Sequence, residues 1–268
     1  MNLGTREYGP RRYQLGMAVF CALAVMCPGG VARAADRWPA ERTAGNFLCH
    51  ADFALDKHAV LLDEMSALPR DLQAILGTRE ATEPVHFFLF EKKATYQAYL
   101  KQYFPKVPAR RALFIKGRGP GMVFAFQGVD FEIDVRHEAT HAILHASLPE
   151  VPLWLDEGLA EYFEMPGEKR FREHPHLKTI QALLRQGQLP RLEELEALRD
   201  VGEMGQDEYR DAWAWVHFAL HGPREATQEL RDYLQDLQTH GDAAGKLSDR
   251  LRRKIPDLNR RLTAHFQR

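Results

Sequence analysis

Hydrophobic positions change their spacing along the chain, from short apolar runs early on to a helical periodicity later. Apolar residues first recur every three to four positions from Asp52 to Leu76, with a break expected at Pro69. The runs VHFFLF (85–90), RALFIKG (111–117) and MVFAFQG (122–128) are rich in strand-forming residues, and a Gly-Pro-Gly turn separates the last two. They predict three strands, the last two forming a hairpin.

Helical periodicity dominates the rest of the chain. The segment KKATYQAYLKQYF (92–104) already has it, and after Asp130 it continues almost to the end. The expected later helices are 134–147, 152–164, 176–186, 192–198, 206–221, 224–239 and a basic last helix from residue 242. Early strands and late helices favour an α+β fold, a small mixed sheet followed by a mainly helical C-terminal lobe.

The N-terminus has the three-part pattern of a secretory signal. Three arginines precede an apolar run (15–27) that is shorter than a membrane span needs, and a small-x-small pattern ends at Ala34. We expect a signal peptide (1–34), a linker (35–50) and one domain (51–268), with export to the periplasm or the exterior and no stable membrane span after cleavage. An uncleaved anchor is the alternative.

Composition and charge are those of an ordinary globular protein. The 268 residues are 45% hydrophobic and 27% charged, with a net charge of −1. Removal of the expected signal takes away four arginines and one glutamate and leaves −4, and it leaves Cys49 as the single cysteine. We therefore expect neither a nucleic-acid partner nor an internal disulfide.

The segment DVRHEATHAILH (134–145) is typical of a helical metal site. His137 and His141 are four residues apart, so both rings lie on one helix face and can reach one ion. Glu138 lies about 100° round the axis, where a base can take a proton from a water at the metal. Imidazole and carboxylate ligands favour Zn²⁺. His145 is about 12 Å along the axis from His137, so we expect it to be an ordinary surface or packed histidine.

A third ligand is expected in LPEVPLWLDEGLAEYFE (148–164). Two prolines let the chain reverse after the histidine helix, and Glu157 and Glu161 are i, i+4 on the next helix. Glu157 would be the third ligand and Glu161 the carboxylate that orients a ligand histidine. Gly158 would remove a side chain where these two helices approach each other. The alternative is an acidic helix with solvated glutamates.

Together these residues resemble the gluzincins, the thermolysin-like and aminopeptidase N-like metallopeptidases, in which His-Glu-x-x-His precedes a helix reading roughly Asn/Asp-Glu-Gly-x-Ala. The resemblance implies a zincin-like fold with Zn²⁺ on His137, His141 and Glu157. It also implies Glu138 as general base and Glu161 as a carboxylate supporting the ligands.

Residues 110–165 look like a group of uncharacterised exported bacterial proteins that are peptidase-like by this motif. The gap of 15 residues between the second histidine and the ligand glutamate is shorter than in the large aminopeptidases. No amine-binding motif precedes the histidines, so the resemblance does not extend to amino-terminal specificity.

Two further parts of such a site are expected. GMVFAFQ (121–127) is a candidate edge strand that pairs with substrate backbone, and the alternative is a plain hairpin strand of the core sheet. On the helix 206–221, Tyr209, Trp213 and His217 share one face. Tyr209 is the first candidate for the oxyanion donor and His217 the second, with an aromatic core stripe as the alternative.

The predicted function is that of an exported zinc-dependent metallohydrolase that cleaves amide bonds in a peptide or protein. The alternative is a catalytically silent, zinc-containing module that binds peptide or cell wall. Glu138 favours the enzyme, because a binding module has no use for a base beside the metal.

Overall fold

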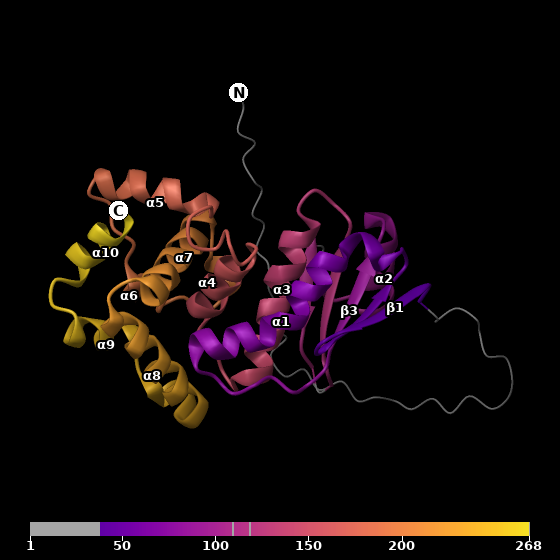
Figure 1. Cartoon of the computed structure of the whole chain (residues 1–268), viewed down its shortest axis with the longest axis horizontal. Coiled ribbons are helices and arrows are strands. Elements are labelled where there is room, and N and C mark those ends of the chain that lie inside the picture. The colour runs from indigo at the N-terminus through magenta and orange to yellow at the C-terminus, as the bar shows by residue number, and fades with distance from the viewer. Residues whose placement is uncertain (1–37, 109, 118, 268) are drawn as a thin grey trace, which may run out of the picture.

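The computed structural model of the chain describes residues 38–108, 110–117 and 119–267. A five-stranded mixed sheet lies in its N-terminal part and a mainly helical region follows, which confirms the α+β prediction (Figure 1). The expected signal peptide lies outside the described residues. Within them, every helix is too short or too polar to cross a membrane.

The sheet has the strand order β1-β2-β3-β5-β4. Its central strands β2, β3 and β5 are parallel to one another, and the outer strands β1 and β4 are antiparallel to their neighbours. The strands are β1 (Ala40–Ala44), β2 (Phe47–Ala51), β3 (Val85–Phe90), β4 (Ala112–Ile115) and β5 (Gly121–Phe126). The predicted hairpin is present as β4 and β5.

The expected edge strand, residues 121–127, is an interior strand. β5 pairs with β4 on one side and with β3 on the other, from Val85 opposite Gly121 to Phe90 opposite Phe126. The alternative, a plain hairpin strand of the core sheet, is thus correct, and β4 is the edge strand of this hairpin. A strand's own sequence does not contain its neighbours, so β-propensity did not distinguish the two positions.

Most of the expected linker belongs to the sheet instead, because residues 40–44 and 47–51 form β1 and β2. β2 alternates in burial, with Phe47, Cys49 and Ala51 facing the core. β1 has the polar sequence AERTA and pairs along one side, so most of its side chains are exposed and its sequence lacks an apolar pattern. Gly45, in the turn between the two strands, has a φ of +58°, which favours glycine.

Two helices differ from the predicted pattern. α1 (Ala59–Leu76) continues through Pro69, because Leu68 and Leu72 on either side of it are packed into the core. The expected basic last helix is two helices separated at Pro256, α9 (Leu247–Lys254) and α10 (Leu258–Phe266). The other α-helices are α2 (Lys93–Tyr103), α3 (Phe131–Ser147), α4 (Leu153–Phe163), α5 (Pro175–Arg185), α6 (Leu192–Leu195), α7 (Gln206–His221) and α8 (Arg224–His240).

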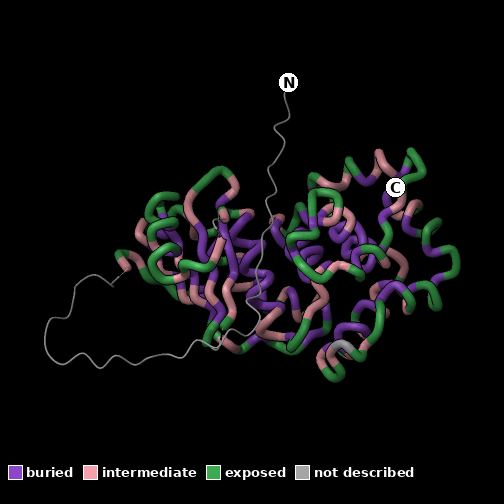
Figure 2. The backbone as a smooth tube through the Cα atoms, turned by 180° about the vertical axis from the view of Figure 1, so that it is seen from behind, coloured by how far each residue is buried: buried purple, intermediate pink, exposed green. Residues whose placement is uncertain are grey.

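Helices cover both faces of the sheet. Buried side chains of α1 and α3 pack on the face that carries Phe47, Phe87 and Val123, in a core that continues into the helical region. α2 packs on the opposite face around Phe90 and Phe124. Buried backbone runs through both halves of the molecule, and exposed backbone lies at its periphery (Figure 2). α4 contacts α3 on the sheet side and α7 within the helical region, so it joins the two halves.

Candidate metal centre

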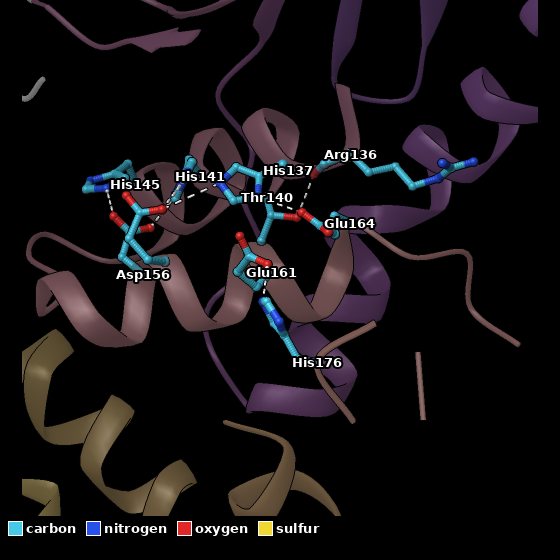
Figure 3. Close-up of polar contacts among 10 residues, drawn as sticks. Arg136, His137, Thr140, His141, His145, Asp156, Glu161, Glu164 and His176 are labelled. Atoms are coloured by element: carbon cyan, nitrogen blue, oxygen red, sulfur yellow. Dashed lines mark hydrogen bonds and ion pairs between the residues drawn. The ribbon is translucent and has the colours of Figure 1, made fainter. Parts of the chain in front are cut away.

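The predicted motifs lie on two neighbouring helices, α3 and α4, whose polar side chains meet between them (Figure 3). α3 ends at Ser147, where Leu148 takes an extended conformation, and α4 begins after Pro152. The chain reverses over these few residues, as the two prolines predicted. Most side chains of both helices are buried, including every residue from Trp154 to Phe163.

His137, His141 and Glu157 come together as predicted. Nε2 of His137 lies 3.5 Å from Oε2 of Glu157, and Nε2 of His141 lies 3.5 Å from the same oxygen. One ligand atom from each residue falls within 4.8 Å of the others, and all three residues are fully buried. Tetrahedral zinc ligands at about 2.0–2.1 Å are separated by about 3.4 Å, so the donor set fits one such ion.

The opposite nitrogen of each ligand histidine faces a buried carboxylate of the same region. Nδ1 of His141 lies 2.7 Å from Oδ1 of Asp156, and Nδ1 of His137 lies 3.2 Å from Oε2 of Glu164. A carboxylate at Nδ1 fixes the proton there and leaves the lone pair of Nε2 directed at the ion. This arrangement is the one that metal-ligating histidines usually have.

Neither Asp156 nor Glu164 was assigned this role from the sequence. Glu164 is seven residues after Glu157, which returns it to nearly the same side of the helix axis. The seven-residue spacing therefore indicated Glu164 as a candidate for this role. The prediction used the i, i+4 neighbour Glu161 instead.

Glu161 lies in a second group of buried residues beside the first. A ligand atom of Glu161 is within 4.8 Å of one from His137 and one from Glu164. Oε2 of Glu161 is also 3.1 Å from Nε2 of His176, and Nε2 of His174 donates to the backbone oxygen of Glu161 at 3.0 Å. Glu161 is therefore close enough to support the ligands, and it also connects α4 to the start of α5.

Gly158 is required for a different contact from the one expected. A Cβ at this position would lie 2.7 Å from the backbone oxygen of Ala212 and 2.9 Å from Cγ2 of Val216, both on α7. The close approach is thus between α4 and α7, and the prediction of an approach between α3 and α4 at this glycine is wrong. Glu157 and Gly158 are one residue apart and so face different sides of α4, one towards α3 and the other towards α7.

Glu138 is 2% exposed and follows the first ligand directly. Burial raises the pKa of the Tyr96 hydroxyl on α2, and the negative charges of Glu138 and Asp134 raise it further. Tyr96 is itself fully buried, and its Oη has no hydrogen-bond partner in the described part of the chain. The proximity of Tyr96 to the motif could not be read from the sequence, because it depends on the packing of α2 on β3 and β5.

The two candidate oxyanion donors are both buried on α7. Nε2 of His217 lies 3.0 Å from the carbonyl oxygen of Phe171, and its Nδ1 lies 2.8 Å from Nε2 of His265. Burial lowers the pKa of His217 to about 3, so the ring is neutral at ordinary pH. Its hydrogen bonds join α7 to the segment before α5 and to α10. The oxyanion roles of Tyr209 and His217 stay predictions.

Comparison with models of protein families and with curated proteins gave no match. The assignment of the site therefore depends on its geometry. Two imidazoles and a carboxylate are buried with their ligand atoms close together. The carboxylates of Glu164 and Asp156 contact the opposite ring nitrogens of the two imidazoles. This cluster is a candidate metal-binding site with the spacing of the His-Glu-x-x-His motif.

Proposed function

We propose that the protein is a zinc-dependent metallohydrolase that cleaves amide bonds in peptides or proteins. The observation that carries this proposal is the pair of 3.5 Å distances from the two Nε2 atoms to one oxygen of Glu157. Three protein ligands of this type leave a coordination position open, which distinguishes catalytic zinc sites from structural ones.

Zinc is the ion that best suits two imidazoles and one carboxylate. When bound, it would act as a Lewis acid and lower the pKa of a coordinated water towards about 7. His137 and His141 would hold it through Nε2, with Glu164 and Asp156 keeping the protons on Nδ1. Glu157 would supply the third ligand atom and a negative charge.

Glu138 is the general base in this proposal. It borders the ligand row because it is rotated about 100° from His137 round the axis of α3. Its carboxylate would take a proton from the attacking water and pass it to the leaving amine, a contribution of the kind worth about 10²–10⁴ in rate. Its burial supports the role, since bulk water is kept from competing for the proton in the site.

The edge strand β4 is the proposed docking site for the substrate backbone. Within the described sheet it pairs along one side, with β5, and it also packs on α3, the helix that carries the histidines. An extended peptide added to this edge would lie along the histidine helix, with main-chain hydrogen bonds that do not depend on its sequence. This geometry supports a peptide or a protein as the proposed substrate.

Export is proposed with the activity, on the pattern of residues 1–34. The substrate would then be outside the cytoplasm, as a free peptide, a protein or a peptide linked to the cell wall. A leader cleaved after Ala34 leaves the described sheet and helices intact.

The first test is the zinc content of the purified chain by elemental analysis, beside a Glu157→Ala variant. We expect about one zinc per chain in the native protein and a large loss in the variant. Glu168→Ala, which removes an exposed carboxylate a few residues beyond α4, is the matched control and should keep the zinc.

Zinc-loaded protein would then be screened against a peptide library. Turnover that Glu138→Gln abolishes supports the hydrolase. Peptide binding without turnover, the same in native and Glu138→Gln protein, would instead identify a binding module. A native chain without zinc even after metal is added back would contradict the proposal.

A further inference from the structure

His145 lies one helical turn beyond the second ligand histidine, and its surroundings differ from those of a surface histidine. Its side chain is 8% exposed, and its Nε2 lies 2.9 Å from Oδ2 of Asp156. The expectation of an ordinary surface or packed histidine was therefore incomplete. The ring is too far along the helix to reach the ion, but it contacts the residue that holds a ligand (Figure 3).

Asp156 uses its two oxygens for two different histidines of α3. Oδ1 faces Nδ1 of His141 at 2.7 Å, and Oδ2 faces Nε2 of His145 at 2.9 Å. Asp156 itself is fully buried. A carboxylate held at both oxygens is restricted in rotation, so its contact with the ligand histidine is fixed more firmly than one hydrogen bond would fix it.

The His145 ring also contacts the edge strand. Phe114 on β4 stacks on it with ring centroids 5.8 Å apart and an interplanar angle of 29°. Phe114 is itself 7% exposed, so both rings of the pair are largely buried. Contacts therefore run without interruption from β4 through His145 and Asp156 to His141.

We propose that His145 is a positioning residue for the metal centre, which donates from Nε2 to Asp156 and thereby holds Asp156 against the ligand His141. Neutral His145 carries its proton on Nε2, and neutral His141 carries its proton on Nδ1. Each ring then donates to one oxygen of the carboxylate, and Nε2 of His141 is left as a ligand atom.

The proposal rests on the metal site of the proposed function. It adds that His145, a residue outside the ligand set, affects how strongly that site binds the metal. The hydrogen bond between Asp156 and His141 should weaken when His145 no longer holds Asp156, even though neither the ligands nor Glu138 is altered. Changes in partners outside the ligand set lower metal affinity by about 10–100-fold in zinc enzymes. His145 contacts the ligand histidine only through Asp156, so we expect its substitution to lower the zinc affinity by about tenfold.

Two substitutions separate the hydrogen bond from the packing. His145→Gln keeps an N–H donor near the place of Nε2 but removes the ring from Phe114. His145→Phe keeps an aromatic ring but removes the donor. Ser147→Ala, on the same helix, is the matched control, because its hydroxyl bonds within its own helix to the Ile143 carbonyl oxygen.

The experiment measures the zinc affinity of the full chain by competition with a chromophoric chelator, and the visible absorption spectrum of the Co²⁺-loaded protein. We expect His145→Phe to bind zinc about tenfold more weakly and to change the Co²⁺ spectrum, with His145→Gln and Ser147→Ala close to native. Circular dichroism and thermal unfolding of the metal-free variants identify a folding defect. If His145→Phe fails to fold, His145→Leu replaces it.

Native affinity and a native Co²⁺ spectrum in a folded variant without the donor would overturn the proposal. Equal weakening in His145→Gln and His145→Phe would also overturn it, because packing rather than the hydrogen bond would then be responsible. Both results leave the metal site itself intact. A native chain that binds neither Zn²⁺ nor Co²⁺ would be a different failure, that of the proposed function together with this proposal.

Discussion

Oε2 of Glu164 lies 3.2 Å from Nδ1 of His137, so Glu164 contacts the ring nitrogen opposite to the one that His137 offers to the candidate metal site. Glu164 is fully buried and immediately follows α4. The sequence assigned this role to Glu161, which lies near the same atoms and also contacts His176. Substitutions can separate the two carboxylates.

We expect Glu164→Gln to weaken zinc binding by about 10–100-fold, because the negative charge that orients His137 is removed. Glu161→Gln should have a smaller effect, since its carboxylate is engaged by His176. Chelator competition on both variants measures the difference. A larger loss in Glu161→Gln would return the role to the residue that the sequence indicated.

Glu138→Gln is expected to retain zinc and to lose hydrolytic activity by at least about 10²-fold. The amide has nearly the shape of the carboxylate but cannot accept the proton from water. The measurement is kcat for a peptide found in the library screen, with zinc content determined on the same sample. Loss of zinc in this variant would mean that Glu138 is part of the ligand set instead.

Gly158→Ala should reduce the free energy of unfolding by about 1–3 kcal/mol, because the added Cβ meets the Ala212 carbonyl at 2.7 Å and forces α4 away from α7. Metal binding should weaken as well, since α4 carries Glu157. Gly167→Ala is the matched control: its Cβ would meet nothing within 4 Å, and a change below about 0.5 kcal/mol is expected. Denaturant unfolding of both variants tests this, and equal stabilities would contradict the close contact.

Tyr96→Phe is expected to leave the free energy of unfolding unchanged or to raise it by up to about 1 kcal/mol, because it removes a buried hydroxyl that has no partner in the described chain. Tyr162→Phe provides the contrast. Its hydroxyl contacts Nε2 of His221 at 2.7 Å, and its removal should lower the free energy of unfolding by about 1 kcal/mol. Thermal or denaturant unfolding compares the pair. A marked loss in Tyr96→Phe would indicate that its hydroxyl is bonded in solution.

Acid should destabilise the protein through His217. Burial lowers its pKa from 6.5 to about 3 in the folded chain, so between these values the unfolded chain binds the proton more readily. The free energy of unfolding therefore falls as pH falls through this range, by up to about 1.4 kcal/mol per pH unit, or about 1.6 kcal/mol from pH 6.5 to pH 5. Burial lowers the pKa of His221 as well, which acts in the same direction.

His217→Gln removes this contribution. Denaturant unfolding at several pH values should give a smaller slope between pH 5 and 6.5 in the variant than in the native chain. An unchanged slope would mean that the ring is hydrated and titrates normally in the folded protein.

The sequence by itself determined most of the helices, three of the five strands and the local part of the site. Helical geometry repeats every few residues, so His137 and His141 had to share a face once their segment was helical, whatever packs against it. In the same way, the i, i+4 spacing places Glu157 and Glu161 on one face of the next helix. Strand-rich runs followed by helical runs likewise predicted the α+β class, and a turn signal predicted the β4–β5 hairpin.

The tertiary structure decided which side chains meet. It placed β5 inside the sheet and β4 at its edge, and it added a strand from the polar segment Ala40–Ala44. It also placed Gly158 against α7 and Asp156 between two histidines. These contacts depend on how elements distant in the sequence pack together. Periodicity fixes the face on which a side chain lies, but the partner on that face comes from another part of the chain.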